Sequence, residues 1–525
     1  MQPEMPATAE ELSPKETAAW FLQRLTPDQG VLNVPTAFRL SAPLRSQPLG
    51  EAAQRLLQRH PALRTLFPAN GDFPSRVVLP ADDARAQIKV TSVDGSGPPM
   101  ADALRTFAGH PFDLTAELPI RIGHFTGWPG GDVVCVAAHH IVFDASSGAV
   151  LTRELLELYR QLSAGDPVSP ELAQEVPPSN GSVPDPASVA FWTEHLTGTP
   201  PQRIAAARQD DDRALFAGER VTRSLPAEVC SLVSSLSKEI RITANILLLS
   251  AYVALLSRAG VGEDVVVGLP IDIRGRRNPD AVGYHMNLVA MRFQARPDMA
   301  FNEFARQVRS TFMASLKHAT VSVDDVFPGA YGGLAPGQEP LFRYLFNFIP
   351  SRVTEVSDNG SGIRFLEVDT GYSRLDLDFT VLSYGTRLDL RTVHRRAVLE
   401  TSQVEALTRS YLKVLESVAE DPALPLAMLA VEPLAPAPAM VRPGPESGST
   451  SASSELLALL RSLWSELLET TAVSDDTHFF RSGGTSLLAA RLVPCIRERT
   501  GVKVTLRDIF RGPTPAALAA RISAI

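Results

Sequence analysis

The chain has 525 residues, 44% hydrophobic and 21% charged, with a formal net charge of −8. This length exceeds what one hydrophobic core organises, so we expect more than one domain. The negative charge argues against a surface for nucleic acid or anionic membrane. No apolar run approaches the ~20 residues that span a bilayer, and the N-terminus lacks an apolar signal core, so we expect a cytoplasmic protein.

The first 433 residues alternate short apolar runs with longer amphipathic segments, which predicts a mixed α/β (α+β) class. A proline-rich stretch at 173–186 predicts a crossover, and we place the lobes at 1–178 and 179–433. Strands are expected at 77–80, 132–140, 264–270, 288–293 and 343–349, and helices at 146–164, 245–260 and 301–319.

Residues 434–453 are rich in proline, glycine and serine, which predicts an extended linker. Residues 454–525 then regain helical periodicity, with leucines and Trp464 on one face of a first helix. A second helix is expected to begin at Ser486, after a glycine pair, and a last one near Pro515. The tail is therefore predicted to be a small helical bundle.

The three cysteines, Cys135, Cys230 and Cys495, are odd in number and widely spaced, so neither a disulfide framework nor a zinc site is indicated. Cys135 lies in the apolar run VVCVAA, which is typical of a buried small hydrophobe rather than a reactive thiol. We expect no bound metal.

The sharpest local feature is the string AAHHIVFD, residues 137–144, between an apolar strand and a helix. Neighbouring residues on a strand point to opposite faces, so only one of His139 and His140 should face a given cavity. An imidazole titrates near neutrality and can take the proton that an amine sheds when it attacks a thioester. The alternative is that both histidines are structural groups at a strand end.

This string resembles the HHxxxD signature of the condensation domains of non-ribosomal peptide synthetases, which are related to chloramphenicol acetyltransferase-like enzymes. Further segments of the chain resemble that family's motifs in the same order. They are LQRHPALRTLF (57–67), VGLPIDIRGRR (267–277), VGYHMNLVAMR (282–292), HATVSVDDVF (318–327) and LFRYLFNFIP (341–350).

The resemblance implies two acetyltransferase-like lobes in a V, with a tunnel between them. It identifies His140, His139 and Asp144 as the catalytic motif. Within it, His140 would face the tunnel as general base or as the group that positions the amine. Asp144 would pair with Arg274, and His139 would pack beside it. Asn287 falls in the asparagine place of its motif and is grouped with Arg274 as structural support.

The tail segment FFRSGGTSLL, residues 479–488, places Ser486 at a helix start, where free N–H groups suit a phosphodiester. Serine is also a common N-cap, so the segment taken alone fits a purely structural role for Ser486 equally well. The segment resembles the FFxxGGxSL signature of peptidyl carrier domains, which are small four-helix bundles. The resemblance implies that Ser486 carries covalent 4′-phosphopantetheine, attached by a phosphopantetheinyl transferase.

The order of the two resemblances predicts an amide-forming acyltransferase. A donor acyl thioester would arrive on an upstream carrier, and the aminoacyl acceptor would be held at Ser486. The gap of ~20 residues leaves no room for an adenylation domain, so we expect a stand-alone adenylation enzyme to load the carrier in trans. Two alternatives stay open: an impaired platform that recruits a tailoring enzyme, and ester formation or transfer to a free amine.

Overall fold

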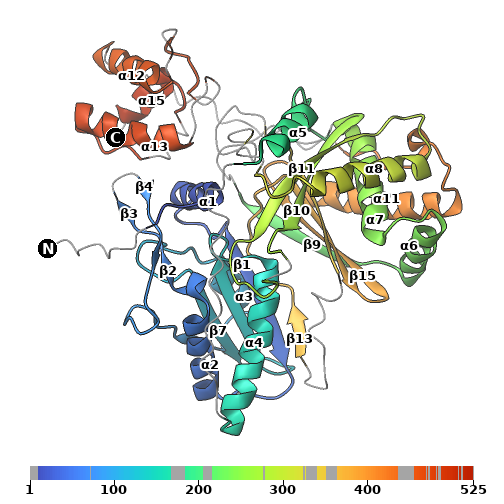
Figure 1. Ribbon diagram of the computed structural model, residues 1–525, viewed down its shortest axis with the longest axis horizontal. Helices are drawn as coiled ribbons and strands as arrows, with labels where there is room; N and C mark the ends of the chain where they lie inside the picture. The colour runs from blue at the N-terminus through green and yellow to red at the C-terminus, as the bar shows by residue number, and fades with distance from the viewer. Residues whose placement is uncertain are drawn as a thin grey trace.

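The computed structural model shows two α/β lobes and a helical unit (Figure 1). It describes residues 10–70, 73–166, 184–204, 216–275, 278–322, 326, 340–350, 363–435, 454–468, 470, 473–479, 482, 486–505, 508–509 and 512–523. The predicted lobe boundary, most of the predicted crossover and almost all of the predicted linker lie outside these residues.

The N-lobe is built on a sheet whose described strands run in the order β13-β1-β8-β7-β6. Strand β8 lies at its centre, antiparallel to both neighbours, and is buried along its whole length because both faces of the sheet are covered. The strands are β1 (Asn33–Leu40), β6 (Val90–Asp94), β7 (Ile120–Thr126), β8 (Val133–His139) and β13 (Ile363–Leu366).

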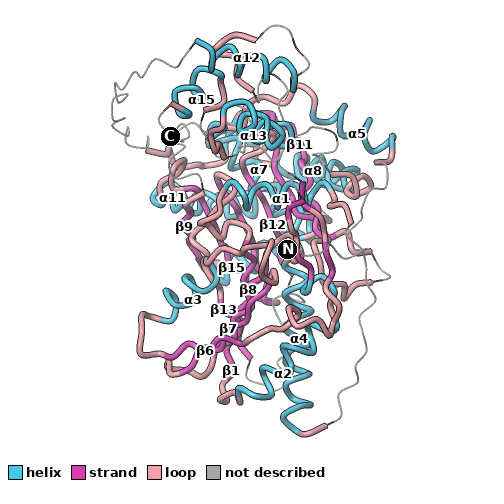
Figure 2. The backbone as a smooth tube through the Cα atoms, turned by 90° about the vertical axis from the view of Figure 1, so that its left-hand side faces the viewer, coloured by secondary structure: helices cyan, strands magenta, loops and turns pink. Residues whose placement is uncertain are grey.

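Helices α2 (Ser46–Arg59) and α4 (Ala145–Ala164) lie side by side on one face of this sheet, and α3 (Met100–Gly109) covers the other (Figure 2). Cys135 is wholly buried under α3, and burial raises the pKa of its thiol to about 12. Helix α1 (Pro14–Leu25) begins at a Ser13 capping box. Two small paired elements complete the lobe, β2 (Thr65–Leu66) with β5 (Val77–Val78) and β3 (Ala69–Asn70) with β4 (Phe73–Pro74).

The C-lobe sheet has the strand order β11-β10-β12-β14-β15-β9 among the described residues. Its helices pack on the side away from the N-lobe (Figure 1). The strands are β9 (Gly218–Ser224), β10 (Asp264–Asp272), β11 (Met286–Gln294), β12 (Tyr344–Ile349), β14 (Leu377–Tyr384) and β15 (Arg387–Arg395). The helices are α5 (Pro186–Leu196), α6 (Ala227–Glu239), α7 (Ala244–Leu256), α8 (Phe301–Leu316) and α11 (Thr401–Glu420).

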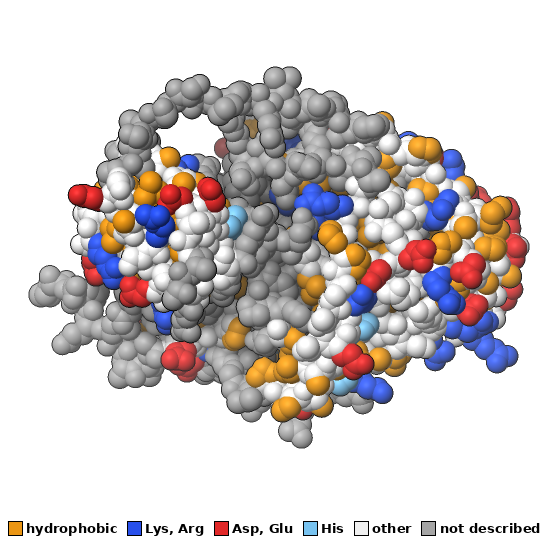
Figure 3. Space-filling view, turned by 90° about the horizontal axis from the view of Figure 1, so that it is seen from above, with side chains coloured by type: hydrophobic (Ala, Val, Ile, Leu, Met, Phe, Trp, Pro, Cys, Tyr) orange, Lys and Arg blue, Asp and Glu red, His pale blue; other side chains and the backbone are white. Residues whose placement is uncertain are grey.

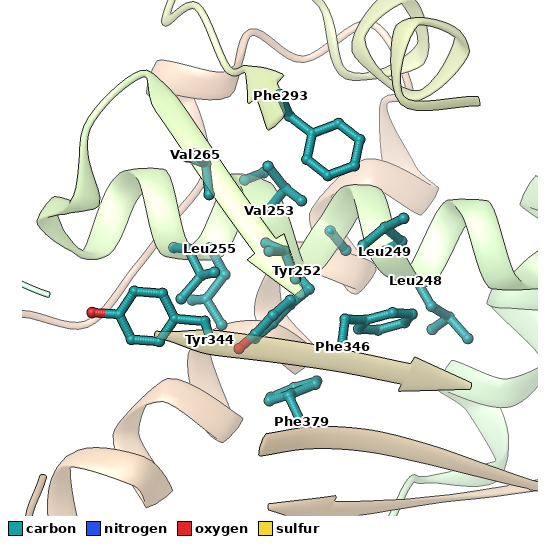
Figure 4. Close-up of a cluster of buried hydrophobic side chains, with 14 of the residues drawn as sticks. Leu248, Leu249, Tyr252, Val253, Leu255, Val265, Phe293, Tyr344, Phe346 and Phe379 are labelled. Carbon is teal, nitrogen blue, oxygen red and sulfur yellow. The ribbon is translucent and has the colours of Figure 1, made fainter. Parts of the chain in front are cut away.

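Helix α7 is the centre of the C-lobe core. Its Tyr252 ring packs against Phe379 at 4.4 Å and Phe346 at 5.7 Å between ring centroids (Figure 4). With the π-helical turn that follows, residues Ala244–Val261 are long and apolar enough to cross a bilayer, a longer apolar stretch than the sequence suggested. Since 72% of this stretch is buried inside the lobe, it has the character of a core helix.

The lobes are also joined through the sheets. Strand β13 lies between β12 and β14 in sequence, yet it pairs with β1 of the N-lobe. The chain therefore leaves the C-lobe sheet after β12, adds one strand to the N-lobe sheet, and returns to the C-lobe sheet at β14.

The tail forms a carrier unit of α12 (Ser454–Leu467), α13 (Ser486–Thr500) and α15 (Pro515–Ile522). Its core holds Leu460, Leu463 and Trp464, and Leu25 at the end of α1 belongs to the same buried cluster. The carrier unit thus packs on α1 (Figure 1). Seen from above, positive and negative side chains are interspersed over its described surface and that of the C-lobe (Figure 3).

Candidate active site

The end of β8 positions the two histidines. The strand closes at His139, and the chain turns through His140 before α4 begins. Backbone hydrogen bonds hold both residues, from His139 N to Pro119 O at 2.8 Å and from His140 N to Leu32 O at 2.7 Å. The two side chains consequently enter different surroundings.

His139 is fully buried and both ring nitrogens are engaged. Its Nδ1 accepts from Ile141 N at 3.1 Å, so we infer that the proton sits on Nε2, which lies 3.2 Å from Gln23 Oε1. Burial, and then the neighbouring His140, lower the pKa of His139 to about 3. His139 is therefore a neutral packing residue without a free nitrogen for chemistry.

His140 has one engaged nitrogen and one available. Its Nδ1 lies 2.7 Å from Phe143 O, and because only a protonated nitrogen donates to a carbonyl, we infer the proton on Nδ1 and a lone pair on Nε2. The Tyr284 ring lies against it, 4.5 Å between centroids. Burial, and then the charge of Arg374, lower the pKa of His140 to about 4, although Asp144 opposes this. The ring is thus a neutral proton acceptor near pH 7.

Asp144 is the N-cap of α4 and joins the lobes. Its carboxylate accepts from Ser147 N at 2.9 Å, Ser147 Oγ at 2.9 Å, His285 N at 3.0 Å and the Arg274 guanidinium. Burial alone would raise the pKa of Asp144, but the effect of Arg274 and of these donors is larger, so the pKa is lowered. An ionised, saturated carboxylate holds the loop in shape and transfers no proton.

Arg274 and Asn287 both support segments around the site. Arg274 also donates to Ala281 O at 2.8 Å, so it ties the segment between β10 and β11 to the N-lobe. The buried Asn287 amide donates to Ala319 O at 2.7 Å and Val321 O at 2.9 Å, which fixes the chain after α8. Arg274 thus supports the loop that bears the histidine motif, whereas Asn287 supports the segment after α8 in the C-lobe.

Three groups around the histidines were missed by the sequence reasoning. Gln23 meets His139 from α1, and Lys15, on the same helix, donates to Met286 O at 3.2 Å and lies 5.2 Å from the centre of the Tyr284 ring. The charge of Arg374, in the segment before β14, lowers the pKa of His140. Their contacts cross from one lobe or segment to another, and no local pattern in the sequence marks them.

Ser486 is the first residue of α13, and its side chain lies outside the described part of the structure, as do residues 483–485. The first turn of a helix has unpaired N–H groups and positive potential, and a serine hydroxyl is the chemistry that a phosphodiester needs. The backbone at Ser486 therefore fits a phosphopantetheine attachment.

Comparison with known proteins assigns both parts of the chain to known families. The condensation-domain family matches residues 8–433, and the phosphopantetheine attachment site family matches residues 458–522. A relative from Salinispora arenicola, described as the probable non-canonical nonribosomal peptide synthetase CymA, is 31% identical over 397 residues. That match covers 73% of this chain and 5% of CymA, so the chain spans a small part of this curated relative.

Solved condensation-type structures share the fold. The first condensation domain of the CDA synthetase has a TM-score of 0.67 at 20% identity, covering 81% of this chain and 99% of its own. The X-domain of teicoplanin biosynthesis, solved in complex with OxyB, has a TM-score of 0.65 at 20% identity, covering 82% and 97%. The chain belongs to the condensation-domain family, continues into a carrier domain of the type that bears 4′-phosphopantetheine, and is a non-ribosomal peptide synthetase didomain.

Proposed function

We propose that this didomain forms an amide bond between a carrier-bound acyl or peptidyl thioester and an aminoacyl acceptor held at Ser486. The observation that carries the proposal is the setting of His140, an imidazole whose Nδ1 is hydrogen-bonded to Phe143 O while Nε2 has no hydrogen-bond partner among the described residues. The acceptor amine must be neutral to attack and must lose a proton afterwards, and such a nitrogen accepts that proton.

Each supporting residue keeps Nε2 in place. Phe143 O fixes the tautomer, Tyr284 supports one side of the ring, and Asp144 with Arg274 holds the loop between the lobes. The 4′-phosphopantetheine group, when attached to Ser486, holds the acceptor as a thioester on a long arm. The residues around His140 then supply proximity and orientation.

The position of the carrier unit supports a role for Ser486 in the same reaction. Leu25, at one end of α1, packs into the carrier core, and Lys15, ten residues earlier on that helix, reaches the Tyr284 ring beside His140. Those ten residues span ~15 Å of helix, so the carrier lies on a helix that leads to the site.

The spacing of the two domains supports loading in trans. Only residues 434–457 lie between the two family matches, which is far too short for an adenylation domain. We propose that a stand-alone adenylation enzyme charges the carrier, that a phosphopantetheinyl transferase modifies Ser486, and that an upstream carrier brings the donor.

The test is reconstitution with the acceptor loaded on Ser486 and a donor thioester supplied, followed by mass spectrometry of the intact protein. His140→Ala should lower the single-turnover rate about 10²–10⁴-fold, the range for general acid–base groups. The matched control is His110→Ala, which changes an exposed histidine outside the site. Equal rates for wild type and His140→Ala would refute the catalytic role, and a Ser486→Ala chain that still gains phosphopantetheine would refute the attachment site.

The similarity to the X-domain, which was solved with OxyB, favours one alternative, a platform that recruits a tailoring enzyme to the carrier. A platform has no need of a nitrogen aimed at a substrate, and the free Nε2 of His140 argues against it. Product analysis in the same reconstitution separates amide formation from ester formation and from transfer to a free amine.

A further inference from the structure

Helix α1 brings a glutamine to the buried histidine of the motif. Gln23 is 7% exposed, and its Oε1 lies 3.2 Å from Nε2 of His139. The end of this helix is fixed on two sides, because Phe21 and Leu22 pack into the N-lobe core and Leu25 packs into the carrier core. The glutamine oxygen is therefore held in place beside the imidazole.

The two ring nitrogens of His139 share one proton, because a neutral imidazole is protonated on one nitrogen only. With that proton on Nε2, His139 donates to Gln23 Oε1, and Nδ1 accepts from Ile141 N at 3.1 Å. With the proton on Nδ1, two donors would face each other, and the buried Ile141 N would lose this partner. The oxygen of Gln23 therefore favours the tautomer that binds the backbone of Ile141.

The backbone at Ile141 belongs to the turn that carries His140. Val142 N bonds His139 O at 3.1 Å, and Phe143 N bonds His140 O at 3.4 Å. Within this turn, Phe143 O lies 2.7 Å from Nδ1 of His140. A lost bond at Ile141 would loosen the turn and change the direction in which Nε2 of His140 points.

The other contacts of His139 leave its proton free to choose either nitrogen. The Phe112 ring meets the imidazole edge-on, 6.2 Å between centroids, and it has no oxygen or nitrogen to accept a proton. Among the residues that the structure describes, Gln23 is the hydrogen-bond partner of Nε2. The tautomer of His139 thus depends on the pair formed by Gln23 and the Ile141 backbone.

We propose that Gln23 is a positioning residue for the condensation reaction, which fixes the tautomer of His139 and thereby holds the turn that aims His140 at the acceptor amine. This inference rests on the proposed function. Gln23 acts through His139 and the Ile141 backbone, and the proton of the amine still goes to His140. A residue two steps removed from the reacting atoms should affect the rate of the reaction more than the binding of the donor.

Single-turnover kinetics of the full chain test the role. An aminoacyl group is loaded on Ser486 from aminoacyl-coenzyme A, and the octanoyl thioester of N-acetylcysteamine serves as donor. Gln23→Leu should lower the rate at saturating donor about 10-fold with the donor KM unchanged, the lower end of the range for partners that orient an imidazole in metal sites. Gln23→Asn, whose oxygen is one methylene short of the ring, should show the same loss.

Two further variants complete the kinetic test. Gln23→Glu should restore most of the rate, because a carboxylate at this place can only accept from Nε2 of His139. Gln54→Leu is the matched control. It removes from α2 a half-buried glutamine that bonds Ala86 O at 2.9 Å and Ile88 N at 3.1 Å, and it should keep the wild-type rate.

Nitrogen-15 NMR of the histidine rings reports the tautomer directly and needs no substrate, with His139→Gln to assign the signals. The wild type should carry the His139 proton on Nε2, and Gln23→Leu and Gln23→Asn should populate the form protonated on Nδ1. Gln23→Glu should keep the wild-type tautomer. It should also raise the pKa of His139, because a carboxylate favours the imidazolium, against burial and the neighbouring His140.

Four outcomes would overturn the proposal. An unchanged rate in Gln23→Leu and Gln23→Asn removes the role. A lower rate with an unchanged tautomer, or one that Gln23→Glu does not restore, shows that Gln23 acts by packing alone. A wild-type chain that forms no amide refutes the proposed function itself, whereas an active wild type with unaffected variants refutes only the role of Gln23. Thermal midpoints show whether a lost rate reflects unfolding, and if Gln23→Leu unfolds, Gln23→Asn and Gln23→Glu decide the case.

Discussion

Breaking the ion pair between Asp144 and Arg274 tests how the lobes are held together at the catalytic loop. The two side chains are only 2% and 3% exposed. Removing one member of a buried pair leaves an uncompensated charge and typically costs about 3–5 kcal/mol. In Arg274→Ala the carboxylate keeps its bonds from Ser147 and His285, so we expect the lower end, about 3 kcal/mol.

Differential scanning calorimetry of the full chain measures this loss. In a unit of 150–250 residues each kcal/mol lowers Tm by ~2–4 °C, so Arg274→Ala should lower the lobe transition by ~6–12 °C. The matched control is Arg153→Ala. Arg153 pairs with Asp280 at 2.7 Å, but the side chains are 55% and 61% exposed, and such pairs contribute ~1 kcal/mol or less. Equal small shifts in both variants would refute the reasoning.

Three further changes have defined outcomes. Because burial lowers the pKa of His139 and His140 to about 3 and about 4, the unfolded chain binds more protons below pH ~6.5. Stability should therefore be fully present above pH ~6.5 and fall on acidification toward pH 4, and His139→Gln should flatten a plot of Tm against pH. Pro494 lies inside α13, where it removes a backbone donor, so Pro494→Ala should stabilise the carrier unit by up to ~3 kcal/mol in calorimetry; an unchanged carrier transition would contradict this. The Tyr252 hydroxyl is buried without a hydrogen-bond partner among the described residues, so Tyr252→Phe should raise the free energy of urea unfolding by ~1 kcal/mol, and a decrease would show that the hydroxyl is bonded.

Local patterns were enough to predict most elements that bear the site. The apolar run before His139 predicted β8, and the helix expected at 146–164 is α4, which ends at Gly165 with a left-handed φ of 76°. Strand β13 was missed. Its four residues pair with β1 across most of the chain, and such a partner leaves no local signal in either segment.

The site likewise combines residues that local motifs predicted with residues that they did not. His140, Asp144 and Arg274 lie in segments that resemble family motifs, and in the structure Arg274 lies against Asp144, the pairing that the resemblance implied. Gln23 and Tyr284 meet the histidines from α1 and from the approach to β11. These contacts join segments that are far apart in the sequence, so no local pattern predicts them.

The strand exchange between the lobes has a consequence during synthesis. Strand β1 lacks its β13 neighbour until residue 363 has been synthesised, because Leu40 pairs with Ile363. During the synthesis of more than three hundred residues, this edge of the N-lobe sheet is therefore unpaired. An uncovered strand is a template for pairing with another chain. Nascent chains of this protein should therefore be prone to aggregation until β13 has been synthesised. The N-lobe expressed by itself should aggregate unless residues 363–366 are supplied.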